Sequence, residues 1–329
     1  MKTAITGASG LVGGNLAAAL REAGHEVVAT RRPSSKVAHL DDLDLRWVDA
    51  DLSSTEALAR AFDGAEVVFH CAAAVSVRRV PPPWMIDANV TGTQRIIDAC
   101  RAAGVRRLVH CSSTVAVGVS EDARPIDETA PWNLPAHGLD DAYATTKHDS
   151  EQLVHAAVRE GLDAVIVNPG YMFGPRDVRP SSGRLILEVV NGRVPGMTPG
   201  SNCFVDVRDV TASMIAAAER GRTGERYILG GTNLTYVEVF RLIAQVAGVR
   251  PPRFTLPRWL SMAAGLAGDL QEALSDAEPM LNRSTVAWGY EPGFRFSSAK
   301  AQTELGHRAR PVEQSVQAAL DWFATHGVR

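Results

Sequence analysis

The sequence predicts an α/β fold in which a doubly wound parallel sheet is joined by a smaller, interleaved C-terminal lobe. In the first half, short apolar runs alternate with segments of helical spacing, a pattern typical of parallel sheets with crossover helices. After about residue 170 this alternation ends, and Pro and Gly cluster over 169–200. The 329 residues suffice for one large unit or two lobes, and 45% hydrophobic with 22% charged residues is ordinary for a globular protein.

The first-half elements follow from these runs. Val12, Leu16 and Leu20 share one face of a first helix, which Gly24 ends. Further helices are expected over 84–104 and 143–158. Right-handed crossovers fix the general topology. The predicted strands are 2–6, 26–30, 45–48, 66–70, 106–111 and 163–168.

The second half predicts a helix near 208–220, a strand near 225–229, and helices near 235–248, 256–281 and 311–326. We therefore expect residues 1–170 to form the sheet domain, with 205–230 and 311–329 returning to it. Residues 171–204 and 231–310 are expected to form the substrate-binding lobe.

Charge and composition narrow the function classes. The net charge of −3 and the lack of a long basic run give no indication of nucleic-acid binding. No apolar stretch approaches a membrane span, and the N-terminus is strand-like rather than signal-like, so a cytoplasmic protein without a membrane partner is expected. The four cysteines and nine histidines show no ligand spacing, so no metal is expected.

The stretch "ITGASGLVGG" places three glycines, Gly7, Gly10 and Gly13, between the first strand and the first helix. One glycine of such a fingerprint permits the tight turn, one lets the backbone approach a pyrophosphate, and one lets helix pack on strand. The helix N-terminus then faces the phosphates with free N–H groups. An ordinary strand–helix turn is the alternative, but the context favours a dinucleotide site in a Rossmann-like domain.

The second strand indicates which cofactor is bound. An acid roughly 20 residues past the glycines would bind the ribose hydroxyls and indicate NAD. Arg31 and Arg32 occupy that place, and a guanidinium matches a 2′-phosphate. A solvated arginine pair is the alternative in a chain with 30 Arg and four Lys. NADP(H) is therefore expected, with NAD possible.

A candidate catalytic pair lies in "DDAYATTKHDSEQL", where Tyr143 and Lys147 are four residues apart and share a helix face. Hydride transfer to a carbonyl needs a proton donor at the oxygen, and a nearby lysine can lower the tyrosine pKa or hold the ribose. Hydroxyls follow the preceding strand in "LVHCSSTVAVG", at the edge where open sheets bind ligands. Either Ser112 or Ser113, or neither, could bond the substrate oxygen.

These stretches together resemble the extended short-chain dehydrogenase/reductases, also called the NAD-dependent epimerase/dehydratase family. The motifs on which this resemblance rests are T-G-x-x-G-x-x-G from Thr6, Y-x-x-x-K, "DANVTGT" and "VNPGYMFGPRD". "RRPSS", "ERYILGG" and "FSSAKAQTELG" look most like the dihydroflavonol-reductase-like group, which includes hopanoid-associated sugar epimerase-like proteins. The resemblance covers nearly the whole chain and does not fix the substrate.

The resemblance implies site residues. It selects Ser113 beside Tyr143 and Lys147, and assigns Asn89 either a structural role or a place in a proton relay. It favours Arg32 over Arg31 at the 2′-phosphate. The cofactor-binding residues implied are Gly7, Ser9, Gly10, Leu11, Val12, Gly13, Arg31, Arg32, Asp51, Leu52, Cys71, Ala72, Ala73, Ser112, Tyr143, Lys147, Pro169, Gly170 and Tyr171.

Three functions fit this sequence. The first is an NADP(H)-dependent carbonyl reductase or alcohol dehydrogenase acting on a small apolar or aromatic aldehyde or ketone. The second is a nucleotide-sugar epimerase or dehydratase, for which Arg179, Arg184 and Arg208 could bind a pyrophosphate. The third is a non-catalytic NADP sensor, against which the intact tyrosine, lysine and serine argue.

Substrate specificity is expected in four segments, 76–84, 116–140, 171–204 and 256–285. The preference for an apolar substrate rests on their side chains, which could equally form the core of the lobe. These residues are Val75, Val77, Pro81, Pro82, Pro83, Trp84, Met172, Phe173 and Met197.

A homodimer is expected through the two helices 84–104 and 143–158, which relatives pair across a two-fold axis. A helix needs only one apolar stripe to pack on its own sheet. Extra apolar positions can form a second face that is buried against a second copy of the chain. The alternative is that all these side chains face the sheet. The candidate positions are Ile86, Val90, Ile97, Leu153, Val154 and Val158.

Overall fold

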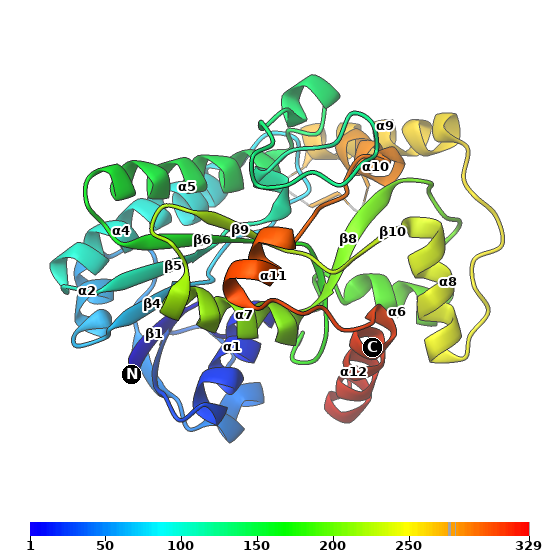
Figure 1. The fold of residues 1–329 in the computed structure, drawn as a ribbon. Helices are drawn as coiled ribbons and strands as arrows, with labels where there is room; N and C mark the ends of the chain where they lie inside the picture. The colour runs from blue at the N-terminus through cyan, green and yellow to red at the C-terminus, as the bar shows by residue number, and fades with distance from the viewer. Residues whose placement is uncertain (276–277, 280, 329) are drawn as a thin grey trace.

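The computed structural model describes residues 1–275, 278–279 and 281–328. Residues 276, 277 and 280 of the expected helix 256–281, and residue 329 of the expected segment 311–329, lie outside the described residues. Figure 1 shows a large sheet with helices on both faces, and a second lobe beside the carboxyl ends of its strands.

The large sheet is wholly parallel, with the strand order β3-β2-β1-β4-β5-β6-β9. The doubly wound, Rossmann-like sheet predicted from the alternating pattern is confirmed, and each predicted strand lies within about one residue of an observed one. The chain reverses direction of winding between β1 and β4, where open α/β sheets form their ligand crevice. The strands are β1 (Lys2–Thr6), β2 (Glu26–Arg31), β3 (Arg46–Asp49), β4 (Val67–His70), β5 (Arg107–Cys111), β6 (Ala164–Pro169) and β9 (Arg226–Leu229).

Helices cover both faces of this sheet because its strands are apolar on both sides. On one face, Leu16 of α1 (Leu11–Glu22), Met214 of α7 (Val207–Arg220) and Leu305 of α11 (Ala299–Leu305) join one buried cluster. On the other face, Leu58 of α2 (Thr55–Phe62), Ile96 of α4 (Gly92–Ala102) and Val154 of α5 (Ala142–Arg159) join a second.

The second lobe contains a three-stranded sheet that the sequence did not predict. β8 (Ser201–Asp206) is buried throughout and pairs antiparallel with β10 (Thr232–Thr235) and parallel with β7 (Tyr171–Phe173). The Pro- and Gly-rich surroundings gave no periodic signal, because a strand buried on both faces does not alternate. Helices α6 (Arg184–Val190) and α8 (Tyr236–Ala247) pack against one another beside it.

The last helix, α12 (Val312–His326), packs in this second lobe. Its Val316, Ala319 and Phe323 lie in the same buried cluster as Phe173 and Ile243. This differs from the expectation that 311–329 return to the first domain, because the apolar stripe of α12 meets α8, β7 and β8. In the segment 205–230, by contrast, α7 packs against α1 of the first domain, and β9 joins the large sheet.

The remaining elements are short or lie at the edge of the site. The helix expected over 84–104 is divided into α3 (Pro83–Ile86), a π-helical turn η2 (Asp87–Thr91) and α4. Three 3-10 turns are η1 (Ala38–Leu43), η3 (Thr114–Ala116) and η4 (Leu134–His137). Helices α9 (Arg258–Leu274) and α10 (Arg283–Tyr290) pack together in the second lobe. None of the described helices is both long and apolar enough to cross a bilayer.

The apolar positions proposed for a dimer do not all face outward. α4 and α5 are adjacent, as expected, but Ile97 and Val154 are completely buried against the sheet. Leu153 and Val158 are partly buried against the same cluster, whereas Ile86 is exposed. The outward orientation expected for Ile97 and Val154 is therefore wrong, because both belong to the stripe that packs on the strands.

Candidate active site

The glycine turn has the geometry that a phosphate cradle requires. Gly7 has φ of +74°, and a Cβ there would lie 2.6 Å from the backbone nitrogen of Ala72. A Cβ on Gly13 would lie 2.3 Å from the Gly7 carbonyl oxygen, so this glycine lets α1 approach the turn. A Cβ on Gly10 would lie 3.5 Å from its nearest protein atom, the Gly7 carbonyl oxygen. The fold itself therefore has room for a side chain at this position.

A cavity of about 610 Å³ lies beside this turn. Gly10 is the N-cap of α1 and has no side chain to satisfy the free N–H groups of the first helical turn, so these groups remain available to an anion. The strand-end loops supply the rest of the wall. Lining residues include Gly7, Ser9, Gly10, Arg31, Arg32, Asp51, Leu52, Cys71, Ala72, Ala73, Val75 and Trp84. These residues fit a dinucleotide, with the glycine turn at its phosphates.

The two arginines of this wall differ in their surroundings. Arg31 donates to Asp49 at 2.9 Å, and its guanidinium lies over the Trp47 ring. Arg32 is exposed, and its backbone is held by Ser35: its N–H donates to the Ser35 hydroxyl at 3.2 Å and its carbonyl accepts the Ser35 N–H at 2.9 Å. Within the described residues we find no ion-pair partner for the Arg32 guanidinium. The charge best placed to meet an added phosphate is therefore Arg32.

Tyr143 and Lys147 lie on the first turns of α5, one helical turn apart. The helix begins there because the Asp141 carboxylate caps it, accepting the Ala144 N–H at 2.8 Å. Asp141 also accepts the Trp288 indole N–H at 2.8 Å, which ties α10 to this helix start. Burial raises the pKa of Asp141 to about 6, against the opposing effect of these two hydrogen bonds.

Lys147 is 3% exposed and donates to the Cys111 carbonyl oxygen at 2.7 Å. Burial lowers the pKa of Lys147, although Cys111 and Glu151 act in the opposite direction. A hydrogen bond with the Cys111 thiol, and then burial, raise the pKa of Cys71, which itself lines the cavity. The ammonium group therefore lies beside the strand ends that form the cavity wall.

The Tyr143 hydroxyl is strongly affected by its surroundings. Burial raises its pKa well above the ordinary range, and a hydrogen bond with Ser113 opposes that rise. A lowering of this pKa by Lys147 stays a prediction. The tyrosine is accordingly protonated at neutral pH, the state that a proton donor needs.

The two serines at the end of β5 have different environments. The Ser112 hydroxyl donates to Glu151 at 2.7 Å in the buried interior. Ser113 caps the 3-10 turn η3, accepting the Val115 N–H at 3.4 Å, and its hydroxyl also interacts with Tyr143. Of the two, Ser113 is the one whose hydroxyl can meet a substrate oxygen together with Tyr143.

Asn89 connects the loop after β4 to helix α5. It lies in the π-helical turn η2, and such turns often occur at functional sites. Its amide accepts the Ala74 N–H at 2.7 Å and donates to the Ala74 carbonyl at 2.9 Å and the Thr146 hydroxyl at 3.1 Å. The contacts account for a structural role; a relay role stays a prediction.

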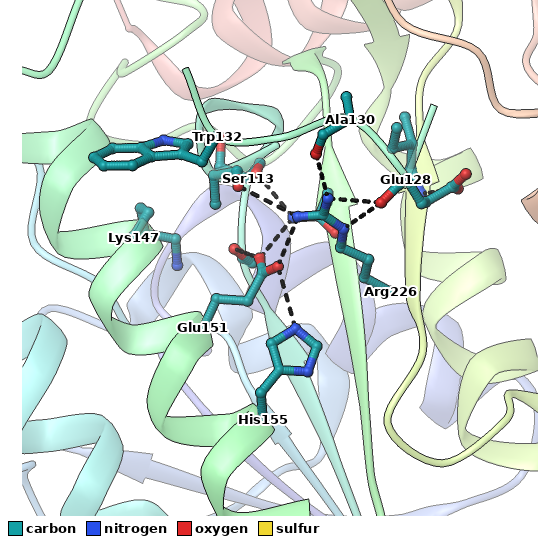
Figure 2. Close-up of polar contacts among 12 residues, drawn as sticks. Ser113, Glu128, Ala130, Trp132, Lys147, Glu151, His155 and Arg226 are labelled. Carbon is teal, nitrogen blue, oxygen red and sulfur yellow. Dashed lines mark hydrogen bonds and ion pairs between the residues drawn. The ribbon is translucent and has the colours of Figure 1, made fainter. Parts of the chain in front are cut away.

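A buried network around Glu151 escaped the sequence analysis (Figure 2). Glu151 is completely buried and accepts hydrogen bonds from Ser112 at 2.7 Å and Asn168 at 2.8 Å. Arg226 of β9 pairs with it at 3.3 Å and also donates to the carbonyls of Glu128 and Ala130. Burial alone would raise the pKa of Glu151, but bonds from His155, Ser112, Arg226 and Asn168 outweigh it and lower the pKa. The sequence signal that could have revealed Glu151 is its position four residues after Lys147, on the same helix face.

Arg226 joins the loop after β5 to helix α5 through this network. The loop carbonyls that it binds belong to residues 128–130, downstream of Ser113, while its charge meets Glu151 on α5 (Figure 2). Trp132 of the same loop stacks on His148 of α5 with ring centroids 3.9 Å apart. The loop at residues 128–132 is thus tied to α5 both through Arg226 and through the Trp132–His148 stack.

Other expected residues are more deeply packed. Tyr171 packs against Phe173 and Phe204, and its hydroxyl donates to the Ser182 carbonyl at 3.4 Å. Gly170 approaches Cys203 closely, since a Cβ there would lie 2.3 Å from the Cys203 carbonyl oxygen. Contacts of the Pro169, Gly170 and Tyr171 loop with a nicotinamide stay a prediction.

Of the nine apolar residues used to infer the substrate class, three pack in a core and two line the cavity. Phe173 and Met197 are buried in the second lobe, and Met172 packs against the main core. Val75 and Trp84 line the cavity and are 62% and 55% exposed. The preference for an apolar substrate therefore rests on Val75 and Trp84.

No group of three or more His, Cys, Asp or Glu side chains that could hold a metal ion occurs among the residues that the structure describes. His70 bonds to Thr6 and Thr93, and burial lowers its pKa to about 3.

The parallel sheet, glycine turn and tyrosine–lysine helix define the class of dinucleotide-binding oxidoreductases. Residues 3–230 match the NAD dependent epimerase/dehydratase family, and the chain belongs to it. The chain is 34% identical to sterol demethylase protein B of Methylococcus capsulatus, with 100% of each chain covered. It is 32% identical to a putative dihydroflavonol 4-reductase of Synechocystis, covering 98% of this chain and 94% of that one. The crystal structure of gox2253 superposes with a TM-score of 0.86 at 36% identity, covering 99% and 98%.

Proposed function

We propose that this protein is an NADP(H)-dependent carbonyl reductase or alcohol dehydrogenase. One observation carries the proposal: Tyr143 lies one helical turn before the buried Lys147 on α5, and Ser113, at the end of β5, acts on the Tyr143 pKa through hydrogen bonding. This arrangement lies beside a cavity whose glycine turn fits a dinucleotide.

The residues have distinct roles in this proposal. When bound, the nicotinamide supplies a hydride to the substrate carbonyl carbon or accepts it from the alcohol. Tyr143 donates a proton to the carbonyl oxygen as the carbonyl is reduced, and takes it back in the oxidation. Ser113 orients the same oxygen, and Lys147 contributes its charge beside the tyrosine.

The preference for NADP(H) over NAD(H) is supported by Arg32. Its exposed guanidinium lies in the cavity wall, whereas Arg31 is held by Asp49. A planar guanidinium can bind a 2′-phosphate through two parallel hydrogen bonds.

The substrate class that we propose is an apolar or aromatic aldehyde or ketone. Val75 and Trp84 supply apolar surface at the cavity, which suits such a compound better than a sugar nucleotide. Two relatives carry names that refer to a dihydroflavonol and to a sterol, which are ring compounds.

A nucleotide-sugar epimerase or dehydratase is the second candidate, favoured by the description of the family. It would need basic residues for a pyrophosphate. Of the three arginines expected to serve, Arg208 donates to both carboxylate oxygens of Asp206 at 2.9 and 2.7 Å, and Arg184 lies 3.8 Å from Glu188. These contacts weaken that candidate.

A homodimer through α4 and α5, and a cytoplasmic location, belong to the same proposal. The adjacency of α4 and α5 supports the first, although the buried Ile97 and Val154 cannot contribute to it.

The test is a substrate scan that follows NADPH absorbance with aromatic and aliphatic carbonyl compounds and with sugar nucleotides. On a compound that is reduced, Tyr143→Phe should lower turnover by about 10²-fold or more while NADPH affinity stays unchanged. Tyr236→Phe, which removes a buried hydroxyl from the second lobe, is the matched control. Wild-type turnover in the Tyr143 variant, or conversion of sugar nucleotides alone, would overturn the proposal.

A further inference from the structure

Helix α9 presents an apolar face to the outside of the molecule. Trp259, Leu266, Leu270 and Leu274 are separated by seven, four and four residues, spacings that place them on one helix face. Their exposed fractions are 73%, 57%, 60% and 78%. Phe254, just before the helix, is 59% exposed. Such a contiguous exposed patch marks an interaction site in a stable protein.

The same helix is attached to the protein through small residues on its opposite side. Ser261, Gly265 and Gly268 are buried, and a Cβ on Gly265 would lie 3.0 Å from the backbone nitrogen of Arg283. The Ser261 hydroxyl bonds to the Tyr290 hydroxyl at 2.8 Å. Because the small side faces inward, the large apolar side chains of α9 are left largely exposed. Figure 1 shows α9 at the edge of the second lobe, beside α10.

Charge at the N-terminal end of this face is positive. Over residues 249–268 the sequence carries Arg250, Arg253 and Arg258 and no acidic residue, and all three arginines are exposed. The two acids of α9 lie nearer its C-terminal end and have partners: Asp269 pairs with Arg283, and Glu272 accepts the Arg79 N–H at 3.3 Å and a bond from Asn282 at 3.4 Å. An anionic surface would therefore meet three arginines beside the apolar face.

We propose that α9 and the loop 250–257 dock on the surface of an anionic lipid bilayer. A helix with Trp, Phe and Leu on one face and arginines at its edge lies in the plane of the interface, its apolar side chains among the upper acyl chains. Each arginine near an anionic leaflet adds electrostatic attraction. A symmetric contact between two copies of this face would instead bring like charges together.

Docking would also place the cavity close to the lipid. The loop after β4 carries Val75 in the cavity wall, and two residues later the Val77 N–H donates to Glu278 at 2.6 Å. Asn282, which caps α10, donates to the Val77 carbonyl. The segment that follows α9 thus contacts the cavity loop, so an apolar substrate dissolved in the bilayer would have a short path to it. The docking itself does not depend on the proposed reductase activity.

The test is vesicle flotation of the full chain with phosphatidylcholine vesicles and with vesicles that also contain phosphatidylglycerol. Two triple variants are compared, W259S/L266S/L270S and R250Q/R253Q/R258Q. The control for the first is Ile86→Ser, an exposed apolar residue on α3, and the control for the second is R46Q/R60Q/R159Q, with the same change of charge on other surfaces. Circular dichroism and melting show whether each variant is folded.

We expect the wild type to float with the anionic vesicles and to bind neutral ones at least tenfold less. Each α9 variant should weaken binding by roughly 10²-fold, and each control by less than about twofold. Failure of the wild type to float, or equal losses in variants and controls, would overturn the proposal. So would light scattering that shows a dimer in the wild type and a 35.2 kDa monomer in W259S/L266S/L270S, because a second copy would then cover the face.

Discussion

Replacing Arg226 by methionine should destabilise the protein strongly, although Arg226 lies on the edge strand of the sheet. The ion pair with Glu151 spans 3.3 Å, and the two side chains are 18% and 1% exposed. Removing one partner of a buried pair costs about 3–5 kcal/mol, because the other charge is left uncompensated. Methionine keeps the apolar stem of the arginine, so the loss reflects the charge and its hydrogen bonds.

The loop after β5 adds to this cost. The Arg226 guanidinium donates to the Glu128 carbonyl at 2.9 and 2.6 Å and to the Ala130 carbonyl at 3.0 Å. Each such bond contributes about 1 kcal/mol when both partners are satisfied. We therefore expect a loss for Arg226→Met at or above the upper end of that range, about 5 kcal/mol or more, and a smaller loss for Glu151→Gln, which keeps an oxygen for Ser112 and Asn168.

A double-mutant cycle measured by urea denaturation isolates the pair. The combined variant Arg226→Met/Glu151→Gln should be about 2 kcal/mol more stable than additivity predicts. Arg101→Met, at an exposed pair with Glu160, is the control and should lose less than about 1 kcal/mol. A loss below about 1 kcal/mol for Arg226→Met, or additivity within about 0.5 kcal/mol, would refute the reasoning.

Three further predictions concern the helix cap, the glycine turn and the cofactor. The folded-state pKa of Asp141, about 6, lies above its ordinary 3.8, so this group adds stability below pH 3.8 that is lost as the pH rises through about 6. The full loss of stability is up to about 3 kcal/mol. Urea midpoints measured at pH 4.5 and 7 should therefore fall with rising pH for the wild type, and Asp141→Asn should abolish this fall. The same pH dependence in both proteins would contradict the prediction. Gly10→Ala should keep the melting temperature and weaken NADPH binding. Gly13→Ala should instead cost about 1–3 kcal/mol of stability, because its Cβ would lie 2.3 Å from a carbonyl oxygen. A destabilised Gly10→Ala with normal NADPH binding would exclude the role of the glycine turn as a phosphate cradle. Arg32→Ala should weaken NADPH binding by about 1.5–3 kcal/mol and leave NADH binding unchanged, with Arg31→Ala as the control; calorimetry showing equal losses for both cofactors would exclude the 2′-phosphate role.

Much of the large sheet could be predicted because its signals are local. Apolar runs and glycine punctuation are properties of neighbouring residues, so β1 and the turn at Gly7 are visible in the sequence. The second sheet was not, because β8 is buried on both faces and pairs with strands on either side of it in the chain. The packing of α12 on α8 is likewise a long-range contact that the apolar stripe of α12 alone cannot specify.

The same distinction holds within the candidate site. Tyr143 and Lys147 are separated by one helical turn, and that spacing is visible in the sequence. The separate environments of Ser112 and Ser113, and of Arg31 and Arg32, depend on partners from other elements. Nothing in the stretch "CSST" shows that Glu151 holds the first serine and leaves the second to interact with Tyr143.

One face of α5 links the proposed chemistry to the stability of the sheet. Tyr143, Lys147 and Glu151 follow at four-residue spacing, so the helix carries a proton donor, a buried cation and a buried anion in one row. The charge of Glu151 favours the protonated form of Lys147, which burial disfavours. Glu151 can remain ionised there because Arg226, Ser112 and Asn168 all meet it. The salt bridge from Glu151 to the last strand of the sheet therefore favours the charged form of Lys147, and the same arginine also donates to the carbonyls of Ala116, Glu128 and Ala130 in the loop after β5.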